Sequence, residues 1–194
     1  MTSTQKTDVR QKLVDTAARL FYTQGYRATG INQIIEEADC CKASFYNHFP
    51  TQEDLLIAWL ERSHNEATSR VRSILAQSLA PRDLVREIFR LHEEQLSASA
   101  YRGCPFMNCL AEIPMAESRV RQVMDWHQRT NRQILEEVVA RVTRDKAPSA
   151  AQVVAIADDV EVIIQGGVTS SRLAGDLKQL RHAQKLTERI LGLA

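Results

Sequence analysis

Residues 29–49, TGINQIIEEADCCKASFYNHF, contain two short segments of helical periodicity joined by a tight turn. Apolar residues recur in the first segment at the spacing of one helical face: Ile31, Ile34, Ile35 and Ala38. We expect this helix to begin after Thr29, whose hydroxyl can cap it, and to end at Asp39, because Asp tolerates the left-handed backbone of a tight turn. The second helix is expected to run from Lys42, with Phe45 and Phe49 facing inward. This pattern predicts a helix-turn-helix.

The outward face of the second helix carries small and hydrogen-bonding side chains, namely Lys42, Ala43, Ser44, Tyr46, Asn47 and His48. Lys42 offers a positive charge to phosphate, and Ser44 and Tyr46 can hydrogen-bond to phosphate or to a base edge. Asn47 and His48 can read base edges, whereas Ala43 permits close approach or contact with a thymine methyl. Taken one by one, such residues more often belong to a solvated helix face. As a cluster they favour DNA.

The chain resembles the TetR family of bacterial transcriptional regulators over roughly residues 8–60. Four segments carry the resemblance: LFYTQGY at 20–26, AT at 28–29, KASFYNHF at 42–49 and PTQEDLL at 50–56. The resemblance implies that the helix from Lys42 enters the major groove and that its outward residues contact DNA, with Thr29 and Lys42 near phosphates. The turn departs from the family pattern, because Asp39, Cys40 and Cys41 replace a glycine, an aliphatic residue and a hydroxyl residue.

Composition is compatible with such a regulator without identifying one. The chain has 194 residues, 44% of them hydrophobic and 25% charged, with a formal net charge of +1, and its few glycines and prolines favour helices. A basic DNA-binding surface must therefore come from the placement of charges and not from their excess. The sequence shows no apolar run of membrane-span length and no signal peptide, so we expect a cytoplasmic protein with its cysteines as thiols.

Helical patterns follow one another along the rest of the chain, and no strand pattern interrupts them. We therefore expect an all-α fold. The resemblance implies a three-helix DNA-binding domain at 7–50 and a larger ligand-sensing and dimerisation domain at 51–194. The expected helices lie at about 8–24, 51–78, from Pro81, from Cys104 to Pro114, at 118–144, 150–173 and 176–192. The helix at 51–78 connects the two domains.

The last two expected helices differ in their apolar surface. The helix at 150–173 is apolar on several faces and contains the pair Gly166-Gly167, which lets another helix approach closely. The resemblance implies that both helices pair with those of a second copy as a four-helix bundle, which makes the protein a homodimer. The alternative is packing within one chain.

A small-molecule effector site is implied by the resemblance for residues 55–140 and part of 150–172. Residues there that combine apolar bulk with a polar group, or lie beside one, are Trp59, His64, His92, Phe106, Met107, Asn108, Trp126, His127 and Asn131. Each taken alone is more often a core or surface residue. The identity of the effector, the operator, the target genes and the sign of regulation stay open.

The four cysteines suggest one alternative mode of control. We expect Cys40 to be a small core residue, whereas Cys41 falls at the start of the second helix, where the helix dipole favours thiolate. Cys41, and secondarily Cys104, are candidate reactive thiols of a redox-responsive or electrophile-responsive regulator. Cysteine and histidine spacing does not match a zinc site, so we expect no metal and no cofactor.

Two other classes of protein fit the sequence less well. Ser44, His48 and Asp39 are residue types of a nucleophilic enzyme, but a ten-residue stretch already explained as a helix-turn-helix holds all three. A helical protein-interaction module would leave the polar cluster of the second helix unexplained. We therefore expect a DNA-binding regulator and not an enzyme, with a double-stranded operator, a small molecule and a second copy as partners.

Overall fold

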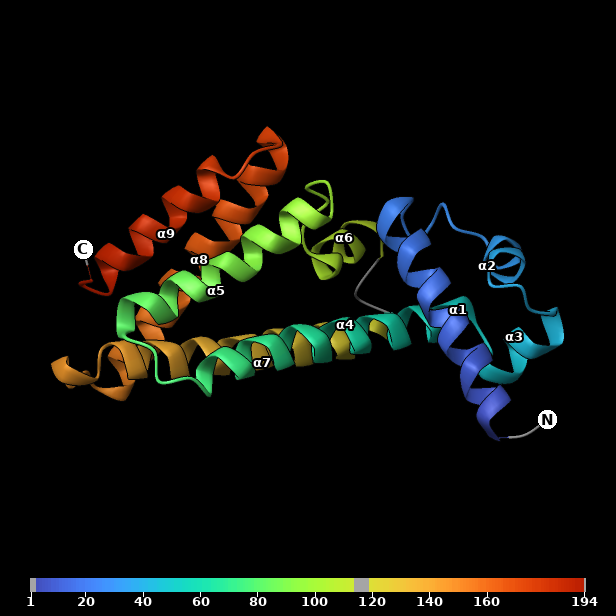
Figure 1. Cartoon of the computed structure of the whole chain (residues 1–194), viewed down its shortest axis with the longest axis horizontal. Coiled ribbons are helices and arrows are strands. Elements are labelled where there is room, and N and C mark those ends of the chain that lie inside the picture. The colour runs from blue at the N-terminus through green and yellow to red at the C-terminus, as the bar shows by residue number, and fades with distance from the viewer. Residues whose placement is uncertain (1–2, 114–118, 194) are drawn as a thin grey trace. The chain divides into compact units, whose positions relative to one another are not determined.

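The computed structural model describes residues 3–113 and 119–193, and every regular element in these ranges is helical (Figure 1). The elements are α1 (Ser3–Thr23), α2 (Ile31–Glu37), α3 (Lys42–His48), α4 (Gln52–Leu75), α5 (Pro81–Ala98), α6 (Pro105–Glu112), α7 (Val120–Val142), the 3-10 helix η2 (Arg144–Lys146), α8 (Ala150–Ala174) and α9 (Lys178–Ile190). The all-α prediction is confirmed. Within the same ranges no helix has both the length and the apolar character of a membrane span.

The first three helices pack through the residues that the periodicity placed inward. Leu13, Ala17 and Leu20 on α1 are fully buried, as are Ile34 on α2 and Phe45 on α3. Helix α1 contacts both α2 and α3, and α2 contacts α3. These contacts form the helix-turn-helix that the spacing predicted.

The turn between α2 and α3 depends on one left-handed residue. Helix α2 ends at Glu37, Ala38 is its C-cap, and Asp39 follows with φ at 49°. The backbone N–H of Cys40 then donates to the Ile35 carbonyl oxygen at 3.2 Å. The expected role of Asp39 in ending the helix is confirmed.

Two compact units emerge from the packing of the chain. The first contains residues 1–66 and 104–125, and the second contains residues 67–103 and 126–194. Helix α6 and the start of α7 thus pack with α1–α4, although they come much later in the sequence. The expected division after residue 50 follows chain order and gives no hint of this insertion.

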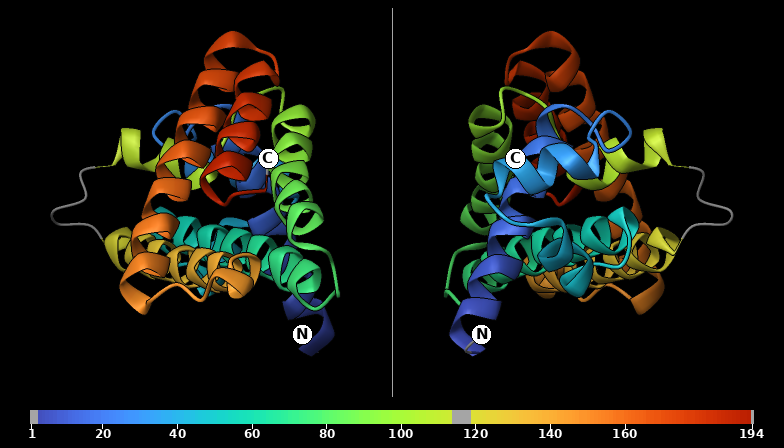
Figure 2. Two further views of the ribbon diagram at one scale, coloured as in Figure 1. Left: turned by 90° about the vertical axis from the view of Figure 1, so that its left-hand side faces the viewer. Right: turned by 90° about the vertical axis from the view of Figure 1, so that its right-hand side faces the viewer.

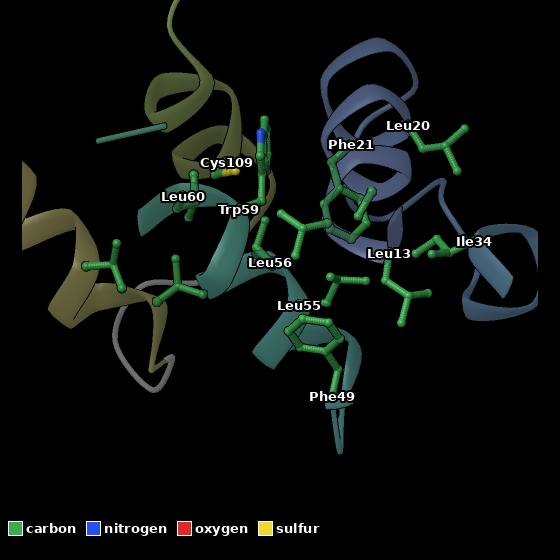
Figure 3. Packing of buried hydrophobic residues seen from close by; sticks show 14 of the residues in the cluster. Leu13, Leu20, Phe21, Ile34, Phe49, Leu55, Leu56, Trp59, Leu60 and Cys109 are labelled. Atoms are coloured by element: carbon green, nitrogen blue, oxygen red, sulfur yellow. The ribbon is translucent and has the colours of Figure 1, made fainter. Parts of the chain in front are cut away.

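The core of the first unit joins side chains from α1, α2, α4 and α6 (Figure 3). Phe21 and Trp59 have ring centroids 5.9 Å apart, and Cys109 of α6 lies beside Trp59 and Leu60 (Figure 3). Burial of large side chains of this kind is the main favourable term in folding.

Helices α5, α8 and α9 lie alongside one another in the second unit (Figure 2). Helices α8 and α9 approach so closely that a Cβ atom built on Gly167 would lie 2.6 Å from the Ala183 Cβ. The buried Ser171 hydroxyl accepts a hydrogen bond from the Leu180 backbone N–H at 2.9 Å. Only glycine at position 167 therefore permits this helix pair.

Helix ends follow local sequence signals with small shifts. Thr51 and Asp54 form the expected capping box at the start of α4, through Thr51 N–H to Asp54 Oδ2 at 2.9 Å and Asp54 N–H to Thr51 Oγ1 at 3.1 Å. Pro81 and Pro105 begin α5 and α6 as predicted. Helix α4 ends at Leu75 instead of residue 78. Pro114, expected to end α6, lies outside the described residues.

Candidate DNA-binding site

Helix α3 separates its buried aromatic residues from an exposed polar face. Phe45 is fully buried and Phe49 is 3% exposed, so the helix is anchored by two rings spaced four residues apart. Lys42, Ala43, Tyr46 and Asn47 are exposed, whereas Ser44 and His48 are half-buried. The structure thus brings six of the predicted DNA-binding residues together on one short helix.

Tyr46 is oriented by the aromatic residue that precedes it. The Tyr46 and Phe45 ring centroids lie 5.2 Å apart with their planes at 80°, an edge-to-face arrangement. The Tyr46 side chain is still 43% exposed. Its ring is therefore supported by the core while its hydroxyl is available to a partner.

Thr29 does not play the capping role that the sequence suggested. The N-cap of α2 is Gly30, and the Thr29 side chain is only 2% exposed. Its hydroxyl points back along the chain and donates to the Gly25 carbonyl oxygen at 2.7 Å. The expected cap is wrong because the hydroxyl is used to close the turn after α1.

Helices α1, α2 and α4 are braced against one another around this turn. Arg19 of α1 forms an ion pair with Glu37 of α2, and the hydrogen bond from Arg19 holds the pKa of the Glu37 carboxyl below its usual range. The Gln52 side-chain amide donates to the carbonyl oxygens of Tyr26 at 3.2 Å and Thr29 at 2.7 Å. These contacts fix the position of α2, on which α3 rests.

Arg10 places a further positive charge beside α3, and the sequence pattern did not predict this. The Arg10 guanidinium of α1 lies over the Phe49 ring, 5.3 Å from its centroid, and Arg10 is exposed. Such a cation–π contact holds a long side chain in place without neutralising its charge. No sequence pattern links two residues so far apart.

Cys41 occupies the N-cap of α3, as expected, and is exposed. Its Sγ lies 3.3 Å from the Ser44 Oγ. The hydrogen bond with Ser44, followed by backbone N–H groups of the first turn, lowers the pKa of the Cys41 thiol. Its position and its chemistry both favour the thiolate form.

The other three cysteines have thiol pKa values that are raised instead of lowered. Burial raises the pKa of Cys40 and of Cys104, and burial with nearby Glu112 raises the pKa of Cys109 to about 12. Cys40 packs against the core of the first unit, as predicted. Backbone N–H groups of Met107 and Phe106 favour the Cys104 thiolate, but burial outweighs them, so Cys104 lacks the lowered pKa of a reactive cysteine. Among the described residues no three His, Cys, Asp or Glu side chains gather as metal ligands would.

The nine effector candidates fall into both units. Trp59, His64 and Phe106 are buried in the first unit, where Asn108 is half-buried and Met107 is 44% exposed. In the second unit, His127 Nε2 and Asn131 Nδ2 lie 3.0 Å apart, Trp126 is 37% exposed, and desolvation lowers the pKa of His92 to about 4.

An apolar cavity of about 10 Å³ lies in the second unit, and none of the nine candidates lines it. It is lined by Val85, Ile88, Phe89, Leu135, Val138, Val139, Val160, Ile164, Thr187 and Leu191. The Thr187 hydroxyl is buried and has no hydrogen-bond partner within the described part of the chain. The space accommodates about one water molecule, so a larger ligand requires the helices to separate.

Comparison with known families finds matches to two models of bacterial regulators over most of the chain. Residues 13–59 match the model described as bacterial regulatory proteins, tetR family, and residues 81–187 match the tetracyclin repressor-like C-terminal domain. The HTH-type transcriptional regulator LmrA of Bacillus subtilis is 26% identical over 179 residues, which cover 90% of this chain and 92% of that protein. The uncharacterized HTH-type regulator YxaF of the same organism is 29% identical over 122 residues, 62% of this chain and 64% of YxaF.

Among solved structures, a TetR-family transcriptional regulator from Streptomyces coelicolor superimposes with a TM-score of 0.78. The two chains are 24% identical, and the match covers 96% of this chain and 93% of the other. At this level of identity the likeness shows a shared fold.

Proposed function

We propose that this chain, which belongs to the TetR family of DNA-binding transcriptional regulators, is a homodimeric repressor that releases a palindromic operator when it binds a small molecule. The observation that carries the proposal is α3, a seven-residue helix with a buried aromatic side and an exposed polar side. The description of the matched C-terminal model as tetracyclin repressor-like supports repression as the output.

Each residue on the outward face of α3 has a role that its chemistry suits. Lys42 contacts a phosphate, Tyr46 and Ser44 hydrogen-bond to phosphates or base edges, and Asn47 is the strongest candidate for a bidentate contact with adenine. Ala43 faces a thymine methyl or allows close approach, and His48 contacts a base edge. Thr29 supports the DNA-binding surface indirectly, because its side chain is buried in the turn before α2.

The homodimer is supported by apolar side chains that α8 and α9 leave exposed. Val162 is 71% exposed and Leu173 is 91% exposed on α8, and Ile190 on α9 is 43% exposed. Gly166 lies between the first two on the same side of α8, and a Cβ atom there would meet nothing within 4 Å. A second copy covers this surface, and its two-fold symmetry places two α3 helices about 34 Å apart on successive major grooves.

An effector acts only through a difference in affinity between the DNA-binding and released forms. Tenfold release requires about 1.4 kcal/mol of such a difference. The residues implied for the effector site, 55–140 and part of 150–172, combine apolar side chains with polar groups, which suits an amphipathic molecule.

Selection of bound fragments from genomic DNA tests the proposal directly. We expect the recovered fragments to share a palindrome, and light scattering to show a dimer that binds one copy of it. A stable monomer at micromolar concentration that binds a single half-site would contradict the dimer. Compounds can then be screened by Trp59 and Trp126 fluorescence and by release of the operator; if every bound compound leaves DNA affinity unchanged, effector control is wrong.

A second mode of control is favoured by one observation, the exposed Cys41 with its lowered thiol pKa. Oxidation or alkylation there places a bulky group at the start of α3 and obstructs its approach to the DNA backbone. Operator binding before and after mild peroxide, in the parent and in Cys41→Ser, tests this mode. Sensitivity that survives in Cys41→Ser and vanishes in Cys104→Ser would move the sensor to Cys104.

A further inference from the structure

The turn at residues 25–29 between α1 and α2 is held by side chains from α4, from α6 and from the turn itself. The Arg27 backbone N–H donates to Glu112 Oε2 at 2.9 Å, across 85 positions of sequence. The Tyr26 carbonyl accepts from the Gln52 side chain, and the Gly25 carbonyl accepts from Thr29. Of these contacts, only the one from Glu112 reaches the turn from α6.

Glu112 also fits closely against Gly25. Gly25 is buried and has φ at +103°, and a Cβ atom there would lie 2.8 Å from Glu112 Oε1 and 3.1 Å from Oε2. The carboxylate therefore occupies the space that any other residue at position 25 would need. Both carboxylate oxygens of Glu112 therefore pack against the turn at Gly25.

The position of Glu112 is fixed by the rest of α6. Phe106 and Cys109 of the same helix are 5% and 3% exposed in the core that α1 and α4 share, and Figure 3 shows Cys109 beside Trp59. Glu112 is the last residue of α6, one turn beyond Cys109. Docking of α6 and contact of Glu112 with the turn thus occur together.

The turn leads directly into the helix that supports α3. Gly30 is the N-cap of α2, and Ile34 and Ala38 of α2 are buried in the same core as Phe45. A shift of the turn therefore passes to α2 and from there to α3. Recognition of bases tolerates little such displacement, since each contact depends on hydrogen-bond geometry.

We infer that Glu112 is a positioning residue for DNA binding: its carboxylate, carried on docked α6, holds the turn before α2 and thereby sets the placement of α3. The inference rests on the proposed DNA-binding function of α3. Loss of this contact lowers affinity for the operator without any change in the residues that touch DNA.

Three variants test the inference in the full-length protein. Glu112→Ala removes the acceptor, Glu112→Gln keeps a neutral acceptor oxygen of the same reach, and Glu61→Ala removes an exposed carboxylate of α4 as the matched control. Affinity is measured by fluorescence anisotropy with the palindrome recovered by genomic selection. Light scattering and thermal unfolding verify that each variant is a folded dimer.

We expect Glu112→Ala to lower operator affinity by roughly tenfold or more, because a hydrogen bond to a charged acceptor is lost, and Glu112→Gln to recover part of it. Loss of a negative charge would by itself strengthen binding to DNA, so weakening identifies a positioning role. Amide hydrogen exchange at Arg27 should accelerate in Glu112→Ala, less so in Glu112→Gln, and not in Glu61→Ala.

The inference is overturned if Glu112→Ala binds the operator as tightly as Glu61→Ala, or if Arg27 exchange is unchanged. Should Glu112→Ala fail to fold, Glu112→Gln decides, and affinity equal to that of the control overturns the inference. Absence of any operator for the parent protein would be a failure of the proposed function instead.

Discussion

The Arg10 guanidinium lies 5.3 Å from the centroid of the Phe49 ring, so a positive charge is held beside the C-terminal end of α3. Because Arg10 is exposed and its charge is not neutralised by this contact, we expect it to bind a DNA phosphate. Arg10→Gln should weaken binding to all sequences alike and reduce the slope of log affinity against log salt by about 0.9. Salt titrations with Arg144→Gln as the control check this; an unchanged slope would exclude the contact.

Asn47 and Tyr46 should separate specificity from affinity. Asn47→Ala is expected to relax the preference at one base pair of each half-site by about 1–3 kcal/mol, as loss of a bidentate contact does. Tyr46→Ala should weaken binding to every sequence, as loss of a hydroxyl hydrogen bond to a DNA phosphate does. Competition between the operator and single-base variants measures both effects. If Asn47→Ala weakens all variants equally, Asn47 contacts phosphate.

Asp39 has φ at 49°, which costs a residue with a Cβ atom more than it costs glycine. Asp39→Gly should therefore raise the free energy of unfolding by about 0.5–1 kcal/mol, net of the extra entropy that glycine loses. Asp39→Ala should lower it, since alanine cannot form the local hydrogen bonds that make Asp tolerable there. Urea unfolding monitored by circular dichroism compares the three; a less stable Asp39→Gly protein would count against this interpretation of the turn.

The buried Thr187 hydroxyl has no hydrogen-bond partner among the described residues and borders a cavity of about 10 Å³. Thr187→Val keeps the shape and removes the unsatisfied oxygen, so we expect it to stabilise the protein by about 1–3 kcal/mol. Thr187→Ala also enlarges the cavity, which should offset the gain. Thermal unfolding tests the order of the three proteins. A destabilised Thr187→Val protein would mean that a bound water satisfies the hydroxyl.

Cys41 should be the most reactive cysteine of the chain. Its thiol pKa is lowered, mainly by Ser44, so its thiolate is present at a lower pH than that of an unperturbed cysteine, for which the pKa is about 8.5. The rate of alkylation by iodoacetamide should accordingly reach its midpoint below that pH, and Cys41→Ser should abolish the fast phase. Ser44→Ala should move the midpoint upward. A fast phase that persists in Cys41→Ser would assign the reactivity elsewhere.

The sequence predicted those features of the first unit that depend on local spacing. Ile34, Phe45 and Phe49 were placed inward by periods of three and four, and Asp39 was placed in the turn by its tolerance of positive φ. Helix ends at Pro81 and Pro105 followed from the chemistry of proline. Such signals act over a few residues, so they can be recognised without knowledge of the fold.

Thr29 was predicted incorrectly, because a hydroxyl next to a helix start can bond forward to the helix or back to the preceding turn. The choice depends on the path of the chain from Gly25, which the sequence does not show. The contacts of Glu112 with Arg27 and of Arg10 with Phe49 join residues far apart in sequence. They depend on how α6 and α1 pack, and packing is decided by the whole core.

Because the first unit combines residues 1–66 with residues 104–125, its core cannot be completed until the ribosome has also made the residues between them, which belong to the second unit. Phe106, Cys109, Val120 and Val123 belong to that core, yet they are synthesised after the helix-turn-helix has emerged. At about 5–20 residues per second, the nascent helices wait several seconds for them, with apolar surface uncovered. During translation the DNA-reading helices therefore stay incomplete until much of the regulatory half has been made, which delays operator binding by an unfinished chain.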